Sequence, residues 1–156
     1  KEMKTIRLTQ DKFAIVDDED FERVNQFKWY ANKDGNTFYA KRHSARPFSK
    51  TVLLHVYLMG APGVDHVDGN GLNCQRENMR LATKSQNGMN RGKGSNNTSG
   101  FKGVSWHKER KKFVARIAVN GRTIHLGYFP TSEEAAHAYD EGAIKYYGEY
   151  AGLNFP

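Results

Sequence analysis

Short runs of alternating apolar and polar residues fill the first sixty positions and indicate a small α+β unit. The pattern predicts a helix over about 18–27 that begins among the acidic residues Asp17, Asp18 and Asp20. Negative charge there suits the positive end of the helix dipole, and a metal site on the same carboxylates is the alternative. Strands are expected at 5–8 and 13–16, and strands or a strand-to-helix junction at 38–42 and 51–56.

A second pattern follows at residues 64–90, where two apolar runs flank a long polar loop. The loop opens with the sequence DGNG at 68–71, which is dense turn chemistry. Thr83 or Ser85 can cap a short helix after the second run. The predicted order is therefore strand, loop, strand and helix, with the ordered elements at 64–67, 79–83 and 85–90.

The stretch 91–100 contains no apolar residue and predicts a flexible, basic linker. It divides the chain into an N-terminal domain over 1–90 and a C-terminal domain over 101–156.

The C-terminal domain shows the pattern of a three-stranded antiparallel sheet packed on one helix. Asn120-Gly121 is a strong hairpin signal, and Thr131 with Glu134 forms a capping box before a helix that reaches about Tyr147. The strands are expected at 102–106, 113–119 and 123–129. On the middle strand the residues expected to face the helix are Phe113, Ala115, Ile117 and Val119, and those expected on the free face are Val114, Arg116, Ala118 and Asn120.

Charge is concentrated in one part of the chain. The 156 residues carry a formal charge of +7, and residues 91–122 hold nine basic residues against one acidic residue. Such a block indicates a polyanionic partner, and a solvated surface is the alternative. No apolar run is long enough for a membrane span, and no basic amphipathic helix suggests a membrane surface. The single cysteine, Cys74, excludes a disulfide framework and a cysteine-rich zinc site.

The loop-containing segment carries the groups that phosphodiester hydrolysis requires. An imidazole such as His66 can take a proton from water near neutral pH. A divalent cation needs hard oxygen ligands, which Asp65 and Asn87 can offer. Neighbouring residues on a regular strand point to opposite faces, so Asp65 and His66 can serve one phosphate only if the strand ends, twists or bulges there.

Residues 55–90 resemble the HNH nuclease motif, the ββα-metal fold, in the form found in phage and intron homing endonucleases. The resemblance rests on Asp65-His66, the middle Asn78 and the final Asn87. It implies that Asp65 and Asn87 hold one Mg²⁺ or Mn²⁺ per active site, that His66 is the general base, and that Asn78 ties the loop to the backbone. Many HNH enzymes have histidine at the last position, so Asn87 favours magnesium over zinc or nickel.

Other polar residues near this motif have structural interpretations. His55 is expected in the core, with DNA contact as the alternative. Asn70 and Asn73 are expected to form turns, and Cys74 to pack without reacting.

Residues 101–156 resemble the plant ethylene-response-factor type of DNA-binding domain, which also occurs attached to phage HNH nucleases. The resemblance rests on Phe101-Lys102-Gly103-Val104, Trp106, Leu126-Gly127-Tyr128-Phe129, Glu133-Glu134-Ala135-Ala136 and the ending Leu153-Asn154-Phe155-Pro156. A sheet of this kind can enter a major groove. The expected DNA contacts are Lys102, Ser105, His107, Arg110, Lys111, Lys112, Arg116, Arg122, Thr123 and His125.

Together these features predict an α+β protein with an HNH nuclease module and a DNA-binding tail. The expected activity is metal-dependent hydrolysis of double-stranded DNA by a homing-type endonuclease, with no small-molecule substrate. A DNA-binding regulator with an inactive nuclease fold is the alternative, and an RNA-binding protein is a third. The oligomeric state is open between monomer and homodimer, and the expected location is the cytoplasm of a bacterial or phage-infected cell.

Overall fold

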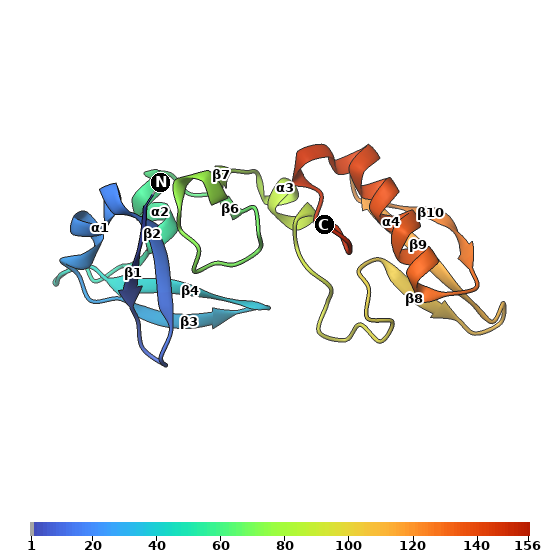
Figure 1. Ribbon diagram of the computed structural model, residues 1–156, viewed down its shortest axis with the longest axis horizontal. Coiled ribbons are helices and arrows are strands. Elements are labelled where there is room, and N and C mark those ends of the chain that lie inside the picture. The colour runs from blue at the N-terminus through green and yellow to red at the C-terminus, as the bar shows by residue number, and fades with distance from the viewer. Residues whose placement is uncertain (1) are drawn as a thin grey trace. The chain divides into compact units, whose positions relative to one another are not determined.

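The computed structural model describes residues 2–156 and divides the chain into two compact units, 1–87 and 88–156 (Figure 1). Both units are mixed α and β, with antiparallel sheets and few helices. Across the described residues, each helix is too short or too polar to cross a lipid bilayer.

The first unit begins with two small antiparallel sheets. Their strands and accompanying helices are β1 (Met3–Arg7), β2 (Phe13–Asp17), α1 (Asp18–Asn25), β3 (Tyr30–Asp34), β4 (Thr37–His43), β5 (Thr51–Leu53) and α2 (Leu54–Met59). β1 pairs with β2, and the second sheet has the order β3-β4-β5. The strand β3 was not expected from the sequence, because its residues YANKD include only two apolar positions.

One core holds the first unit together. Val16, Val24 and Leu54 are almost completely buried in it, and the Trp29 indole nitrogen donates to the Val24 carbonyl at 2.9 Å. The Arg42 guanidinium lies 4.0 Å from the centre of the Phe27 ring, so its charge is held against aromatic faces. This core supports the strand that follows α2.

The last part of the first unit is a two-stranded sheet that encloses a loop. It consists of β6 (Val64–His66), the 3₁₀ turn η1 (Arg76–Asn78) and β7 (Met79–Leu81), and α3 (Lys84–Met89) follows. Thr83 caps α3: its hydroxyl accepts from the Gln86 backbone nitrogen at 3.2 Å, and its own nitrogen donates to Oε1 of Gln86 at 2.8 Å. This capping box explains why the helix begins at Lys84.

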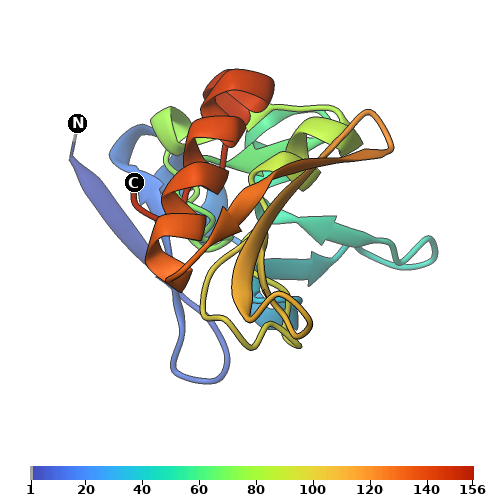
Figure 2. The ribbon, with the colours of Figure 1, turned by 90° about the vertical axis from the view of Figure 1, so that its right-hand side faces the viewer.

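The second unit is a three-stranded sheet covered on one face by a helix (Figure 2). The elements are β8 (Val104–His107), β9 (Lys112–Val119), β10 (Arg122–Phe129), α4 (Ser132–Tyr147) and the 3₁₀ turn η2 (Gly148–Tyr150). Asn120 and Gly121 both have positive φ, at 50° and 75°, in the turn between β9 and β10. The Thr131 hydroxyl caps α4 by accepting from the Glu134 nitrogen at 3.2 Å.

The face of the sheet under α4 follows the predicted alternation. Ala115 and Ile117 are buried against the helix, with Phe113 and Val119 partly buried beside them. Val114, expected on the free face, is nevertheless 1 % exposed. It lies on the central strand of the sheet, between Ser105 and Tyr128 in the strand register.

Residues 88–100 belong to the second unit and are fastened to it by hydrogen bonds. The Asn97 amide donates to the Phe101 carbonyl at 2.7 Å, and the Ser99 hydroxyl to the Val104 carbonyl at 2.8 Å. Residues 91–100 form no helix or strand, and the flexibility of the expected linker stays a prediction. The same polar residues that suggested a linker satisfy backbone groups at the start of the second unit.

Candidate active site and nucleic-acid interface

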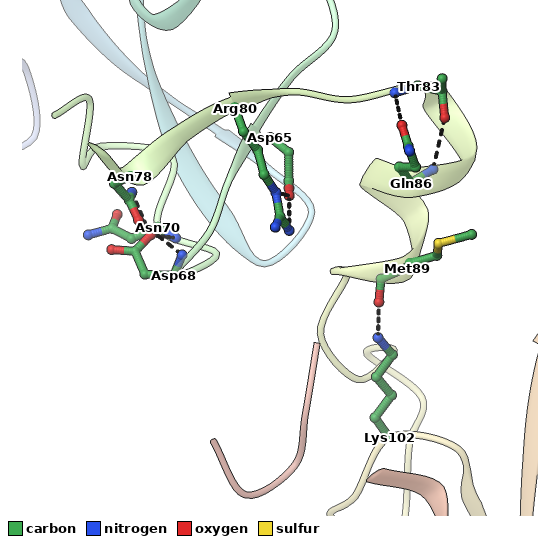
Figure 3. A network of polar contacts seen from close by, with 9 residues as sticks. All are labelled: Asp65, Asp68, Asn70, Asn78, Arg80, Thr83, Gln86, Met89 and Lys102. Atoms are coloured by element: carbon green, nitrogen blue, oxygen red, sulfur yellow. Dashed lines mark hydrogen bonds and ion pairs between the residues drawn. The ribbon is translucent and has the colours of Figure 1, made fainter. Parts of the chain in front are cut away.

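Asp65 lies in the middle of β6, opposite Arg80 of β7 in the antiparallel register. Nε and Nη2 of Arg80 donate to Oδ2 of Asp65 at 2.9 and 2.8 Å (Figure 3). The two side chains are 4 % and 19 % exposed, Asp65 being the more buried. A carboxylate this buried requires a positive partner, and Arg80 supplies it.

His66 is the last residue of β6 and contacts a different set of side chains. Its ring lies 5.0 Å from the His55 ring and 5.9 Å from the Tyr39 ring, centre to centre. Nε2 of His66 is 3.9 Å from the Cys74 sulfur. The strand ends here, as the sequence analysis required, because the Gly69 nitrogen turns back to the His66 carbonyl at 2.9 Å.

Burial determines the protonation state of this histidine cluster. Desolvation lowers the pKa of His66 below its usual value, against the opposing charges of Asp68 and Asp65. Desolvation, with His66 and Lys41 nearby, lowers the pKa of His55 to about 4. Both imidazoles are therefore neutral at pH 7, the state in which a histidine can accept a proton.

His55 and Cys74 have the structural surroundings that the sequence suggested. His55 is 7 % exposed, and its Nδ1 has no hydrogen-bond partner among the described residues. Cys74 is fully buried, and burial raises the pKa of its thiol to about 12. A thiol that stays protonated is a poor nucleophile and a poor metal ligand, so it contributes packing.

Asn78 ties together the loop between β6 and β7 (Figure 3). Its amide nitrogen donates to Oδ1 of Asp68 and to the Asn73 carbonyl, both at 2.9 Å, and its side-chain oxygen accepts from the Asp68 nitrogen at 3.1 Å. Asn70 and Asn73 act inside the same loop: Oδ1 of Asn70 accepts from the Leu72 nitrogen, and the Asn73 amide donates to Asp68. This is the loop-binding role that the resemblance implied for Asn78.

Asn87 lies on α3 with its side chain exposed. Its backbone nitrogen donates to the Thr83 carbonyl at 2.9 Å, which sets it one turn after the cap. Asp65, His66 and Asn78 thus share the β6–β7 sheet and its loop, and Asn87 follows on the next helix. Joint binding of one ion by Asp65 and Asn87 remains a prediction.

The donor set fits a hard divalent cation in its chemistry. A carboxylate from Asp65 and a carboxamide oxygen from Asn87 are oxygen ligands of the kind magnesium and manganese prefer. A second group of carboxylates, Asp17, Glu19 and Asp20, lies at the start of α1 with its oxygen atoms within 4.8 Å of one another.

Arginine already compensates that second group. Nε and Nη2 of Arg76 donate to the two oxygens of Asp20 at 2.8 Å each, and the Arg76 backbone nitrogen donates to Asp17 at 2.9 Å. Arg23 adds a bond to Asp20 at 3.0 Å. The acids at the start of α1 therefore join α1 to the β6–β7 loop region, and the Asp17 side chain makes no capping bond to α1.

The sheet face away from α4 carries most of the expected DNA contacts. Tyr128 lies on this face, on the edge strand β10, with the His125 and His107 rings 4.6 and 5.2 Å from its own and the Arg110 guanidinium 4.7 Å away. Arg116 is exposed beside His125, its partner in the strand register. The other expected contacts that are exposed in this unit are Ser105, Lys111, Lys112, Arg122 and Thr123.

Lys102 is placed in a different environment from these residues. Its ammonium donates to the Met89 carbonyl at 2.6 Å (Figure 3), and desolvation lowers its pKa to about 8. Its backbone is also fixed, because its nitrogen donates to the Asn154 side chain at 2.7 Å. Lys102 therefore makes hydrogen bonds within the second unit, and its expected DNA contact stays a prediction.

Two residues of interest were missed in the sequence. Arg80 could have been found from the strand register, since residues 65 and 80 pair when 66 pairs with 79 across the loop. Tyr128 could have been found from the bulge between His125 and Gly127, which turns it onto the same face as His125. The alternation of apolar and polar residues alone does not give the partner of Arg80 or the face on which Tyr128 lies.

Comparison with known proteins agrees with both halves of this description. The family model for the HNH endonuclease matches residues 62–89, and the AP2 domain model matches residues 99–149. No solved structure gives a significant match.

The similar proteins include viral sequences and plant transcription factors. The Uncharacterized HNH endonuclease L560 of Acanthamoeba polyphaga mimivirus is 33 % identical over 91 % of this chain and 74 % of its own length. Protein 3.8 of Escherichia phage T7 is 35 % identical over 52 % of this chain and 74 % of its own. The Dehydration-responsive element-binding protein 2A of Arabidopsis thaliana is 44 % identical over 48 % of this chain and 23 % of its own. The chain therefore belongs to the HNH endonuclease family and carries an AP2 domain after its HNH segment.

Proposed function

We propose that this protein is a metal-dependent endonuclease that hydrolyses phosphodiester bonds of double-stranded DNA. The observation that carries the proposal is the end of β6, where a neutral imidazole, His66, directly follows a buried carboxylate, Asp65. These two positions lie within the segment that matches the HNH endonuclease family.

In this proposal His66 is the general base. Its lowered pKa keeps the imidazole neutral at pH 7, so it can accept the proton of a water molecule that attacks phosphorus. The loop held by Asn78 fixes the chain directly after His66, because the Val67 nitrogen donates to the Asn78 carbonyl at 2.9 Å. A fixed backbone at this point limits the positions that the imidazole can take.

Asp65 and Asn87 are the residues that would hold a magnesium or manganese ion. When bound, such an ion stabilises the negative charge that develops on the phosphate and the leaving oxygen. The carboxylate and carboxamide oxygens make magnesium the better match among the biological cations.

The AP2 domain supplies DNA affinity. Its free sheet face presents Arg110, Arg116 and His125 around Tyr128, and such side chains suit phosphates and base edges. Because the two units are parts of one chain, binding by one raises the effective concentration of the other at the DNA. The homing-type function belongs to this proposal, with the AP2 face contributing to the choice of site.

One observation favours a second candidate, a DNA-binding regulator with an inactive nuclease fold. Asp65 is ion-paired to Arg80, and His66 is 5 % exposed, so both groups have protein partners in this state. Several AP2-containing relatives are named as transcription factors, including the AP2-like ethylene-responsive transcription factor ANT of Arabidopsis thaliana.

Cleavage of a randomised duplex DNA library, followed by sequencing of the new ends, decides between these two functions. We expect breaks with Mg²⁺ or Mn²⁺ and none in EDTA, and loss of about 10²-fold or more of the rate in His66→Ala. The control is His43→Ala, which changes an exposed histidine outside the cluster. Full DNA binding without breaks in any of these conditions would favour the regulator.

A further inference from the structure

Arg80 is the group in the candidate active site that the proposed chemistry has not used. Nε and Nη2 of Arg80 donate to the same carboxylate oxygen of Asp65, Oδ2, at 2.9 and 2.8 Å. The pair is cross-strand and largely buried, so the positive charge of Arg80 is the counter-ion of Asp65 in the metal-free protein. A metal ion that binds Asp65 would be repelled by the Arg80 guanidinium.

The Arg80 guanidinium and a divalent metal ion would compete for the same carboxylate. A divalent ion beside Asp65 replaces the charge that Arg80 supplies, and two positive groups on one buried carboxylate repel each other. The Arg80 side chain is 19 % exposed, against 4 % for Asp65, so the arginine is the partner with access to solvent. A displaced guanidinium would keep its planar donor fork, which binds phosphate oxygens in pairs.

We propose that Arg80 is exchanged between Asp65 and the DNA backbone: it holds the Asp65 carboxylate in the metal-free protein, and metal binding releases it to a phosphate of the bound DNA. The exchange makes Arg80 and the metal ion competitors for Asp65. It also means that the Arg80 charge is presented to the DNA strand only when the metal is bound. The first half of this inference rests on the ion pair and on the proposed metal binding by Asp65, and the second half also rests on the proposed nuclease function.

The first half is tested without DNA by unfolding and by metal binding. Arg80→Gln should lower the thermal midpoint in EDTA by about 10 °C or more, because a buried carboxylate loses its partner. Mn²⁺ should recover at least half of that loss, and its affinity measured by calorimetry should exceed that of the wild type by about fivefold or more. The thermal midpoint and the Mn²⁺ affinity of Arg80→Lys should lie between those of the wild type and Arg80→Gln.

Two control variants distinguish the loss of the Asp65–Arg80 ion pair from a general loss of stability. Val24→Ala removes volume from the core of the same unit, so its loss of stability should be equal in EDTA and in Mn²⁺. The double variant Asp65→Asn with Arg80→Gln has no buried charge at this point, so it should be more stable in EDTA than Arg80→Gln and show no gain from Mn²⁺. An equal Mn²⁺ affinity in wild type and Arg80→Gln, with no recovery of stability, would overturn the exchange.

The second half is tested by single-turnover cleavage at saturating Mn²⁺. Arg80→Gln should cleave about 10²-fold more slowly than the wild type despite its tighter metal binding, with Arg80→Lys intermediate. Unchanged cleavage by Arg80→Gln would overturn the transfer to phosphate. A wild type that binds Mn²⁺ in competition with Arg80 but cuts no DNA would instead refute the proposed nuclease function and leave the competition at Asp65 standing.

Discussion

At the scale of single residues, the proposed activity depends on the charge of one buried imidazole. Burial lowers the pKa of His66, so the neutral form persists below the pH at which a free histidine is half protonated. A group that must be neutral to act loses activity as pH falls through its pKa. We therefore expect protonation of His66 to set the lower pH limit of the reaction.

The first prediction concerns this acid limit. The single-turnover cleavage rate should fall to half its maximum at a pH below about 6.5, the usual histidine pKa, because burial lowers the pKa of His66. The measurement is the rate at saturating metal between pH 5 and pH 8. An inflection at or above pH 6.5 would show that the proton acceptor is not the buried His66.

The second prediction concerns stability rather than rate, and it involves His55. Its pKa is about 4 in the folded protein and about 6.5 when unfolded, so the unfolded chain binds the extra proton first. The stabilisation from neutral His55 should therefore be fully present above about pH 6.5. The free energy of unfolding should fall by roughly 3 kcal/mol as pH drops toward 4.

Urea unfolding at pH 7.5 and pH 4.5 measures this contribution in the wild type and in His55→Phe. The phenyl ring cannot titrate, so the variant should lose less stability between the two pH values. The exposed His43, changed to Phe, serves as the control. Equal acid sensitivity of His55→Phe and the wild type would assign the effect to other groups.

The sequence predicted which residues are candidates for the site, but only some of their hydrogen-bond partners. Asp65, His66, Asn78 and Asn87 are recognisable because their spacing is carried by the sequence itself. The Arg80 partner and the inward direction of Lys102 depend on register and on distant backbone carbonyls, which local pattern does not encode.

At the scale of elements, strands and helices formed largely where alternation and caps predicted them. The observed β8, β9, β10 and α4 differ by a few residues at most from the expected elements. The elements that were missed or left open, β3 and α2, have short or mixed patterns, and their burial comes from contacts with the rest of the core.

The third prediction compares two glycines of the second unit that share a left-handed backbone. Gly103 has φ of +74° and Gly121 has φ of +75°, so alanine is strained equally at both. A Cβ at Gly103 would lie 2.0 Å from the Tyr139 ring, whereas at Gly121 nothing lies within 4 Å.

Gly121→Ala should therefore cost about 1 kcal/mol, and Gly103→Ala should cost several kcal/mol because the Tyr139 ring must move. The free energies of unfolding of the two variants, taken from denaturant titrations of the full chain, make the comparison. Similar losses at both positions would mean that Tyr139 does not pack against this turn as described.

At the scale of the whole molecule, the nine basic residues of 91–122 include Arg110 and Arg116, which lie on the side of the sheet that α4 leaves uncovered. Arg116 is exposed there, and Lys145 is exposed on α4, which covers the other face of the sheet. The chain divides into two units near residue 88, close to the start of the polar stretch that the sequence analysis took as the boundary.

The fourth prediction uses this difference between the two faces. Arg116→Gln should weaken binding to duplex DNA and reduce the slope of log affinity against log salt concentration by about 0.9, as one phosphate contact is lost. Lys145→Gln makes the same change of charge on α4 and should leave the slope unaltered. Equal reductions in both variants would indicate a response to net charge, with no DNA contact by the sheet face.

The most direct test of the central claim is the anomalous scattering of Mn²⁺ in crystals of the protein with duplex DNA. We expect a manganese peak bound by Asp65 and Asn87, with His66 facing the same phosphate. A peak held by Asp17, Glu19 and Asp20, with Asp65 still paired to Arg80 and no metal near it, would refute the proposed active site.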